Sequence, residues 1–325
     1  MKSQMFQGLY KLLKPSKRIP KETIELVIAY LEAGVEFDQI KNLMTLPYDT
    51  LEQFCSTVYK DHPQVYLKLK NLFSMPMILR YYSDYTLFKN QLFHQIYQQL
   101  SYPLILFVCI YTLMTFFILK IFPMIFLLIS SFDITMPMLR WLYYFVVITY
   151  IALTIIVICF VILIVVLLKK QHLKLFVIVC HQYPWFKTFK MIYTQMFAYT
   201  FLLIYQLGAS TQQILEIMRA STLSYFVGWL SELTTYQLEE GESLIESLDN
   251  HFLDDQFISL FQLGRVDNKI KEYLDTFLDL NHKRIFLDIK KISLTLKQIT
   301  YGLLAILIII FYQILLSPMQ MMSFL

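Results

Sequence analysis

The densest group of ionisable side chains in this sequence lies between positions 239 and 249. Acidic residues take five of these eleven positions, and no basic residue stands among them. One interpretation is a docking patch for a basic partner, because charges at an interface steer association. The other is a solvated helix start, where acids suit the positive end of the helix dipole. The sequence leaves both open, and the candidate docking residues are Glu239, Glu240, Glu242 and Glu246, with Asp249 beside them.

Residue patterns that perform catalysis are missing from the sequence. No Gly precedes a Lys, so the phosphate-binding loop G-x-x-x-x-G-K-[ST] does not occur. The six histidines show no spacing typical of metal ligands, and no G-x-S-x-G nucleophile turn exists. We therefore expect no enzymatic activity, no catalytic residues, no bound metal and no cofactor.

The sequence is 57% hydrophobic and only 16% charged, and three long stretches contain no Asp, Glu, Lys or Arg at all. They cover 95–119, 141–168 and 298–325. Each exceeds the ~20 residues that a helix needs to cross a bilayer, and a helix satisfies its own backbone hydrogen bonds in lipid. We therefore expect an integral membrane protein with transmembrane helices at 101–120, 142–168 and 299–317.

Basic residues beside these stretches indicate orientation, because short cytoplasmic segments carry an excess of Lys and Arg. We expect a cytoplasmic N-terminus and an external C-terminus in the inner, cytoplasmic membrane of the cell. Nucleic-acid binding is a weaker interpretation of the same lysines, so no direct nucleic-acid partner is expected. The basic residues after the second stretch and before the third are Lys169, Lys170, Lys174, Lys283, Arg284, Lys290, Lys291 and Lys297.

Outside the stretches, helical patterns and weak two-residue alternation predict an all-α protein without a sheet. A fourth span at 191–207 is long enough, but it would move the later basic residues outside, so we expect a buried core helix there. The remaining expected parts are a short cytoplasmic helical domain at 1–100, an extracytoplasmic segment at 121–141, a second cytoplasmic helical domain at 169–298 and an external tail at 318–325.

Several helix ends can be predicted from single residues. Gly34 and Gly208 are each expected to end a helix, since glycine is the usual residue just past a helix C-terminus. Ser243 and Glu246 match the capping box S-x-x-E at a helix start. Two further helices, at 254–263 and 266–285, are expected to join at Gly264.

The chain also contains a weak internal repeat. Residues 33–40 align with residues 207–214 with three identities in eight, including Gly34 and Gly208. Each copy is followed by a helical domain and then by a span, which is expected to finish at Pro123 in the first copy and at Pro318 in the second. The repeat predicts two related cytoplasmic helical bundles, the first of them abbreviated.

These features together resemble the inner-membrane platform proteins of type II secretion systems and type IV pili. The order of motifs carries the resemblance along nearly the whole chain. One departure is clear, because the family's Gly-Glu-x-x-Gly corresponds here to Gly264 followed by Arg265, which replaces the carboxylate. The motifs that match are Tyr102-Pro103, Pro123, Tyr183-Pro184, Leu207-Gly208, Gly241-Glu242-Ser243-Leu244 and Pro318.

The resemblance implies a non-enzymatic assembly platform that couples a cytoplasmic hexameric ATPase to the polymerisation of pilin-like subunits. The short first domain is most similar to the Gram-positive competence-pilus branch, which implies a role in DNA uptake. The lipid bilayer and further copies of the chain are the other implied partners. A permease subunit energised by a separate ATPase is the alternative, and a membrane enzyme is a third possibility that the missing catalytic patterns disfavour.

Overall fold

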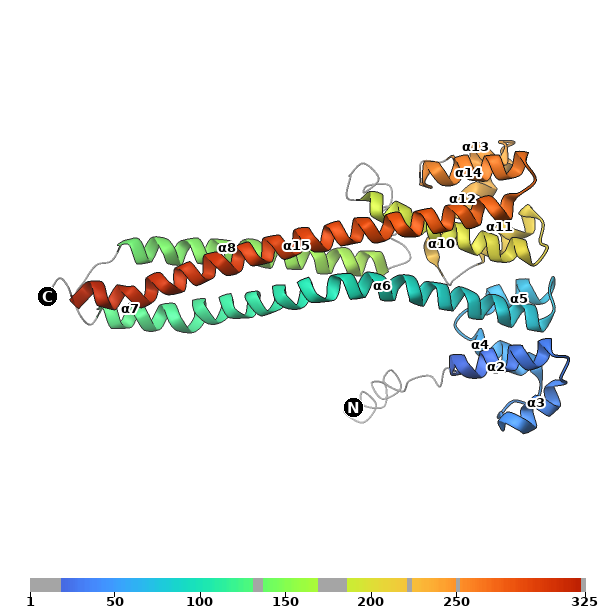
Figure 1. The fold of residues 1–325 in the computed structure, drawn as a ribbon, viewed down its shortest axis with the longest axis horizontal. Coiled ribbons are helices and arrows are strands. Elements are labelled where there is room, and N and C mark those ends of the chain that lie inside the picture. The colour runs from blue at the N-terminus through green and yellow to red at the C-terminus, as the bar shows by residue number, and fades with distance from the viewer. Residues whose placement is uncertain (1–18, 131–136, 169–185, 221–223, 250–251, 323–325) are drawn as a thin grey trace, which may run out of the picture. The chain divides into compact units, whose positions relative to one another are not determined.

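The computed structural model describes residues 19–130, 137–168, 186–220, 224–249 and 252–322 (Figure 1). Every regular element in these ranges is a helix, and none of the described residues forms a strand. The all-α prediction is therefore confirmed for this part of the chain. Pro184, one of the motif residues that carry the resemblance, lies outside the described residues.

The chain divides into two compact units, and each is formed by segments that are far apart in sequence. The first unit contains residues up to Gln91 and then Phe189–Asn281, and the second contains Leu92–Thr188 and His282–Leu325. All three boundaries fall inside helices: α6 (Met75–Phe116), α10 (Phe186–Gln206) and α15 (Ile270–Met322). The first unit thus draws on both of the predicted polar domains, while a repeat of whole domains stays a prediction.

The first unit consists of short helices together with the starting portions of α6 and α15. Its elements before α6 are α2 (Lys21–Glu32), α3 (Phe37–Met44), α4 (Leu51–Val58) and α5 (Pro63–Lys70). Those between the long helices are α10 (Phe186–Gln206), α11 (Thr211–Arg219), α12 (Tyr225–Glu239), α13 (Leu244–Leu248) and α14 (Asp255–Val266).

Aromatic rings of α10 and α14 pack together within the core of the first unit. Phe197 meets Phe257 edge-on at 5.8 Å between ring centroids, and Phe201 meets Phe261 in the same way at 5.3 Å. Phe257 also contacts Phe277 of α15. Edge-to-face pairs add about 0.5–1.5 kcal/mol beyond the area that they bury. These contacts make α10 a core helix.

Buried polar side chains also join α10 to α15. The Asn281 amide donates to the Gln195 side-chain oxygen at 2.8 Å and to the Met191 carbonyl at 2.9 Å. The Gln195 amide in turn donates to the Leu278 carbonyl at 3.0 Å. A polar group in the interior must be hydrogen-bonded to avoid its desolvation cost. Among the described residues, α10 is not one of the helices apolar enough to cross a membrane, in agreement with the prediction.

A single type of turn ends three helices of this unit. Gly34, Gly208 and Gly241 have φ angles of 81°, 88° and 95°, and in each case the next helix has its N-cap two residues later. This left-handed region is the one that glycine enters without steric cost. The expected helix ends at Gly34 and Gly208 are confirmed, and Gly241 makes the same turn.

The second unit contains three apolar helical segments. After α6 the chain continues through a π-helical turn (Phe117–Ile121) into α7 (Phe122–Ser130), and then forms α8 (Pro137–Leu168) and the rest of α15. Three described helices are long and apolar enough to span a bilayer, at Met75–Leu127, Arg140–Cys159 and Ile270–Gln313. The core residues come from all three: Ile110, Met114, Phe117, Phe122, Val146, Leu153, Leu307 and Ile310.

The helices of this unit continue through three prolines. Pro103 lies inside α6, Pro123 lies inside α7, and α15 runs past Pro318 to Met322. The helices thus extend past Pro123 and Pro318, while the expectation that the spans themselves finish at these prolines stays a prediction. Proline blocks the bond to the carbonyl four residues back, and the π turn just before Pro123 bonds the Phe122 N–H to the Phe117 carbonyl. Such local rearrangement lets a proline sit within an apolar helix.

The predicted joint at Gly264 was also wrong, because Gly264 is inside α14. The chain turns at Asn268 instead, which takes the left-handed conformation with φ 54°. The Lys269 N–H then bonds the Gly264 carbonyl at 2.8 Å. Gly264 is small for a different reason, since a Cβ there would lie 3.0 Å from the Ile270 Cα atom and 3.2 Å from the Tyr273 Cβ atom.

The two kinds of glycine should respond differently to substitution. A Cβ at Gly208 would meet no atom within 4 Å, so its cost is that of the backbone alone. We expect Gly208→Asn to be mild, because Asn tolerates this region, and Gly208→Val to destabilise by roughly 1–2 kcal/mol. Gly264→Asn should be at least as harmful as Gly264→Ala, because space is the constraint there. Thermal unfolding of the detergent-purified protein measures these changes, and equal effects of Asn at both sites would contradict the distinction.

Candidate docking surface

The acidic residues surround the turn between α12 and α13. Glu239 ends α12, Glu240 is its C-cap, and Gly241 makes the left-handed turn. Glu242 precedes the N-cap Ser243 of α13. We call residues 239–246 the acidic turn. Its four glutamates are all exposed, so the turn presents a negatively charged surface of the first unit.

Glu246 has a structural role within this turn. Its carboxylate accepts a hydrogen bond from the Ser243 N–H at 2.9 Å, and the Ser243 hydroxyl accepts one from the Glu246 N–H at 3.4 Å. This is the predicted capping box, which the structure confirms. The hydrogen bonds with the Ser243 hydroxyl and backbone lower the pKa of Glu246. Glu246 is therefore a helix cap first, and a docking residue only secondarily.

The other three glutamates make few interactions. The Tyr236 hydroxyl donates to the Glu240 carboxylate, and this bond raises the pKa of Tyr236. Within the described part of the chain, Glu239 and Glu242 make no ion pair. Their carboxylates are free to meet a partner.

The position of two of these acids is electrostatically unfavourable. Glu239 and Glu240 lie at the C-terminal end of α12, where the helix dipole is negative and a basic residue would be stabilising. The interpretation as acids at a helix start fits Glu242 and Glu246 and fails for this pair. Because Glu239 and Glu240 do not stabilise α12, their position favours a role in recognition.

The remaining predicted motif residues serve the backbone and do not form a common site. Gly34, Gly208 and Gly241 make turns, Gly264 permits close packing, and Pro103 is buried within α6. Pro123 follows the π turn.

No candidate metal centre is present in the described residues. They contain no group of three or more His, Cys, Asp or Glu that could hold a metal ion. A shallow hollow in the surface of the described residues, about 450 Å³ in volume, lies beside Asp267, Lys269 and Glu272. Its polar groups already bind one another: the Tyr273 hydroxyl donates to Asp267 at 2.6 Å, and Lys269 pairs with Glu272 at 3.7 Å.

The second unit contains a polar cluster that was not predicted from the sequence. The Tyr102 and Tyr301 hydroxyls lie 3.0 Å apart, and the Lys297 ammonium lies 5.3 Å from the centroid of the Tyr102 ring. The two tyrosines are 199 positions apart, so no local pattern could reveal the pair. The sequence shows only that each tyrosine lies in a charge-free stretch, Tyr102 in 95–119 and Tyr301 in 298–325.

Comparison with known proteins gives no assignment: no family model, no curated protein and no solved structure matches the chain.

The acidic turn should tolerate charge reversal without loss of folding. In a triple variant, Glu239, Glu240 and Glu242 are each changed to Lys, which places basic residues at the negative end of α12. We expect an unchanged or slightly higher unfolding temperature, because the side chains are exposed. Ser243→Ala should instead destabilise by about 1 kcal/mol, because it removes the cap. Unfolding of the triple variant below the temperature of Ser243→Ala would show that the turn is structural.

Proposed function

We propose that this chain is a non-enzymatic membrane platform that assembles a type IV-like competence pseudopilus for DNA uptake. In this role it couples a cytoplasmic hexameric ATPase to the polymerisation of pilin-like subunits. The observation that supports the proposal best is the continuity of α6 and α15, each of which contributes to the cores of both units. A displacement imposed on the first unit would then reach the apolar segments through unbroken backbone.

The packing of α15 illustrates this arrangement. Leu274 and Phe277 are buried in the first unit, and Asn281 is fastened there by its hydrogen bonds to α10. Leu307 and Ile310 of the same helix belong to the core of the second unit. A helix that is fixed at both places transmits rotation or axial movement, whereas a flexible linker would absorb it.

The acidic turn is the surface that we assign to the ATPase. It is exposed, it carries carboxylates without ion pairs among the described residues, and two of them lie where they do not stabilise their own helix. The triple-Lys variant should therefore lose the ATPase on co-purification at low and moderate salt. A matched control changes Glu22, Glu36 and Asp279 to Lys, which reverses the same number of exposed charges elsewhere on the first unit.

The orientation proposed for the chain places the first unit in the cytoplasm. The basic residues of α15 before the charge-free stretch support this orientation, as does the expected site of an ATPase. Pilin-like subunits would meet the lipid-exposed apolar segments, and further copies of the chain would complete the platform.

A permease subunit energised by a separate ATPase is the second candidate. A permease needs polar or charged groups that line a path through the bilayer. The described apolar segments do contain a polar contact, in which the Tyr111 hydroxyl meets the Tyr150 and Thr154 hydroxyls at 3.1 Å. These groups bond one another between α6 and α8, which is typical of helix association in membranes. The platform is therefore the better-supported function.

Making α15 more flexible between Asn281 and Leu307 tests whether this helix couples the two units. Lys283→Gly with Leu287→Gly places two flexible residues at exposed positions, and the alanine pair at the same positions is the control. Each glycine costs about 1 kcal/mol relative to alanine in a helix. We expect the glycine pair to insert and bind the ATPase but to lower DNA uptake strongly, while the alanine pair stays active. Equal uptake by both variants at equal membrane levels would contradict coupling through this helix.

A further inference from the structure

The cluster around Tyr102 joins α6 to α15 near the starts of the spans expected at 101–120 and 299–317. Besides the Tyr102–Tyr301 contact, the Ser293 hydroxyl donates to the Gln99 carbonyl at 2.8 Å and links the same two helices. The two tyrosines are about half exposed, at 52% and 48%. The cluster is thus a fixed arrangement of polar groups that remains accessible from outside.

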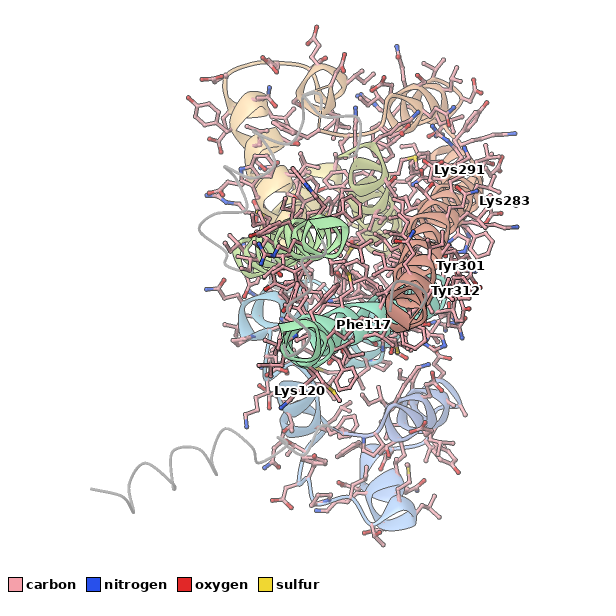
Figure 2. The ribbon with its side chains drawn as sticks, turned by 90° about the vertical axis from the view of Figure 1, so that its left-hand side faces the viewer. Phe117, Lys120, Lys283, Lys291, Tyr301 and Tyr312 are labelled. Atoms are coloured by element: carbon pink, nitrogen blue, oxygen red, sulfur yellow. The ribbon has the colours of Figure 1, made fainter. Side chains whose placement is uncertain are left out.

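Helix lengths place this cluster at one boundary of the hydrocarbon layer. Lys120 follows Tyr102 by 18 residues, or about 27 Å along a helix, close to the ~30 Å thickness of the hydrocarbon. Phe117 packs against Phe311, whereas Lys120 is exposed one turn later (Figure 2). Tyrosine and lysine are enriched at the two membrane surfaces. Tyr102 and Lys120 therefore lie near opposite surfaces.

The cluster has unused capacity to bind an anion. The contact between the Tyr102 and Tyr301 hydroxyls uses one of their two protons, so the second remains available as a donor. The Lys297 ammonium lies over the Tyr102 ring and makes no ion pair among the described residues. Lys290 is exposed two turns earlier on the same face of α15, and in this part of the chain it too makes no ion pair. Lys291, by contrast, is paired with Asp288 at 3.6 Å.

The surface that continues from the cluster is apolar. Ile308 and Tyr312 follow Tyr301 at helical spacing along α15, and they are 57% and 61% exposed. Figure 2 labels Tyr301 and Tyr312 on this helix, with Lys283 and Lys291 on its basic portion. One line of side chains therefore changes from basic to apolar at the level of the tyrosine pair. A phospholipid has the same order of charged head and apolar tail.

We propose that Lys297, Tyr102, Tyr301 and Lys290 form a binding site for an anionic phospholipid. The phosphate lies at the Lys297 ammonium and the free tyrosine hydroxyl, the charged headgroup extends toward Lys290, and an acyl chain packs along Ile308 and Tyr312. A second copy of the chain in parallel is a poorer occupant, because its lysines would face these lysines. Free phosphate matches the head of the site and leaves the apolar line uncovered.

Lipid-dependent thermal stability tests the site in the full-length, detergent-purified protein. Dioleoylphosphatidylglycerol, dioleoylphosphatidylcholine or inorganic phosphate is added, and the unfolding temperature is measured. The test variant is Lys290→Gln with Lys297→Gln. The control, Lys271→Gln with Lys283→Gln, removes the same charge from exposed positions of the same helix. A third variant, Tyr102→Phe with Tyr301→Phe, removes both hydroxyls and keeps the lysines.

We expect the phosphatidylglycerol to raise the unfolding temperature more than the phosphatidylcholine does, and inorganic phosphate to have little effect. The test variant should bind phosphatidylglycerol about 10- to 30-fold more weakly, since each basic residue near an anionic surface contributes several-fold. The tyrosine variant should show a smaller loss, and the control none. Equal effects of the two lipids on the wild type, or an undiminished effect on the test variant, would overturn the proposal. A response to inorganic phosphate as large as that to the lipid would reassign the cluster to a soluble anion and overturn it also.

Discussion

Lipid offers no hydrogen-bond partners, so every backbone N–H and C=O group inside it must be satisfied by the chain itself. This constraint accounts for the longest elements of the structure. Pro103 and Pro318 lie within helices that continue past them, and the turn before Pro123 widens to a π-helix instead of breaking. Interruption would expose unpaired carbonyls to hydrocarbon, whereas a local change of hydrogen-bond register costs much less.

Features that depend on local sequence could be predicted, whereas features that depend on packing between distant segments could not. Charge-free length and basic flanks reveal the apolar helices, and a capping box such as Ser243 with Glu246 is local chemistry, so these were predictable. Proline and glycine were less reliable, because their meaning depends on surroundings: Asn268 makes the turn that was assigned to Gly264. The contact between Tyr102 and Tyr301 depends on the packing of two distant helices, which no short pattern encodes.

Polar groups within the protein serve two distinct purposes. In the first unit, Gln195 and Asn281 are fully buried and hold α10 against α15, where leaving either unpaired would be costly. Glu239 and Glu240 are exposed at the negative end of the α12 dipole, where they do not stabilise the helix, and we infer that they face a partner. A chain with a firmly fastened core and an unfavourably placed acidic surface is suited to transmit force from a partner, which is the role proposed here.

The central claim is that three helices cross the membrane and leave the first unit on the cytoplasmic side. A paired reporter experiment tests it most directly, with alkaline phosphatase, active only outside the cytoplasm, and green fluorescent protein, fluorescent only inside. Each is fused after Gln53, after Asp249 or at the C-terminus. The account predicts fluorescence without phosphatase activity at Gln53 and Asp249, and phosphatase activity without fluorescence at the C-terminus. Phosphatase activity at Asp249 would contradict it, because α10 would then have crossed the bilayer as a fourth span.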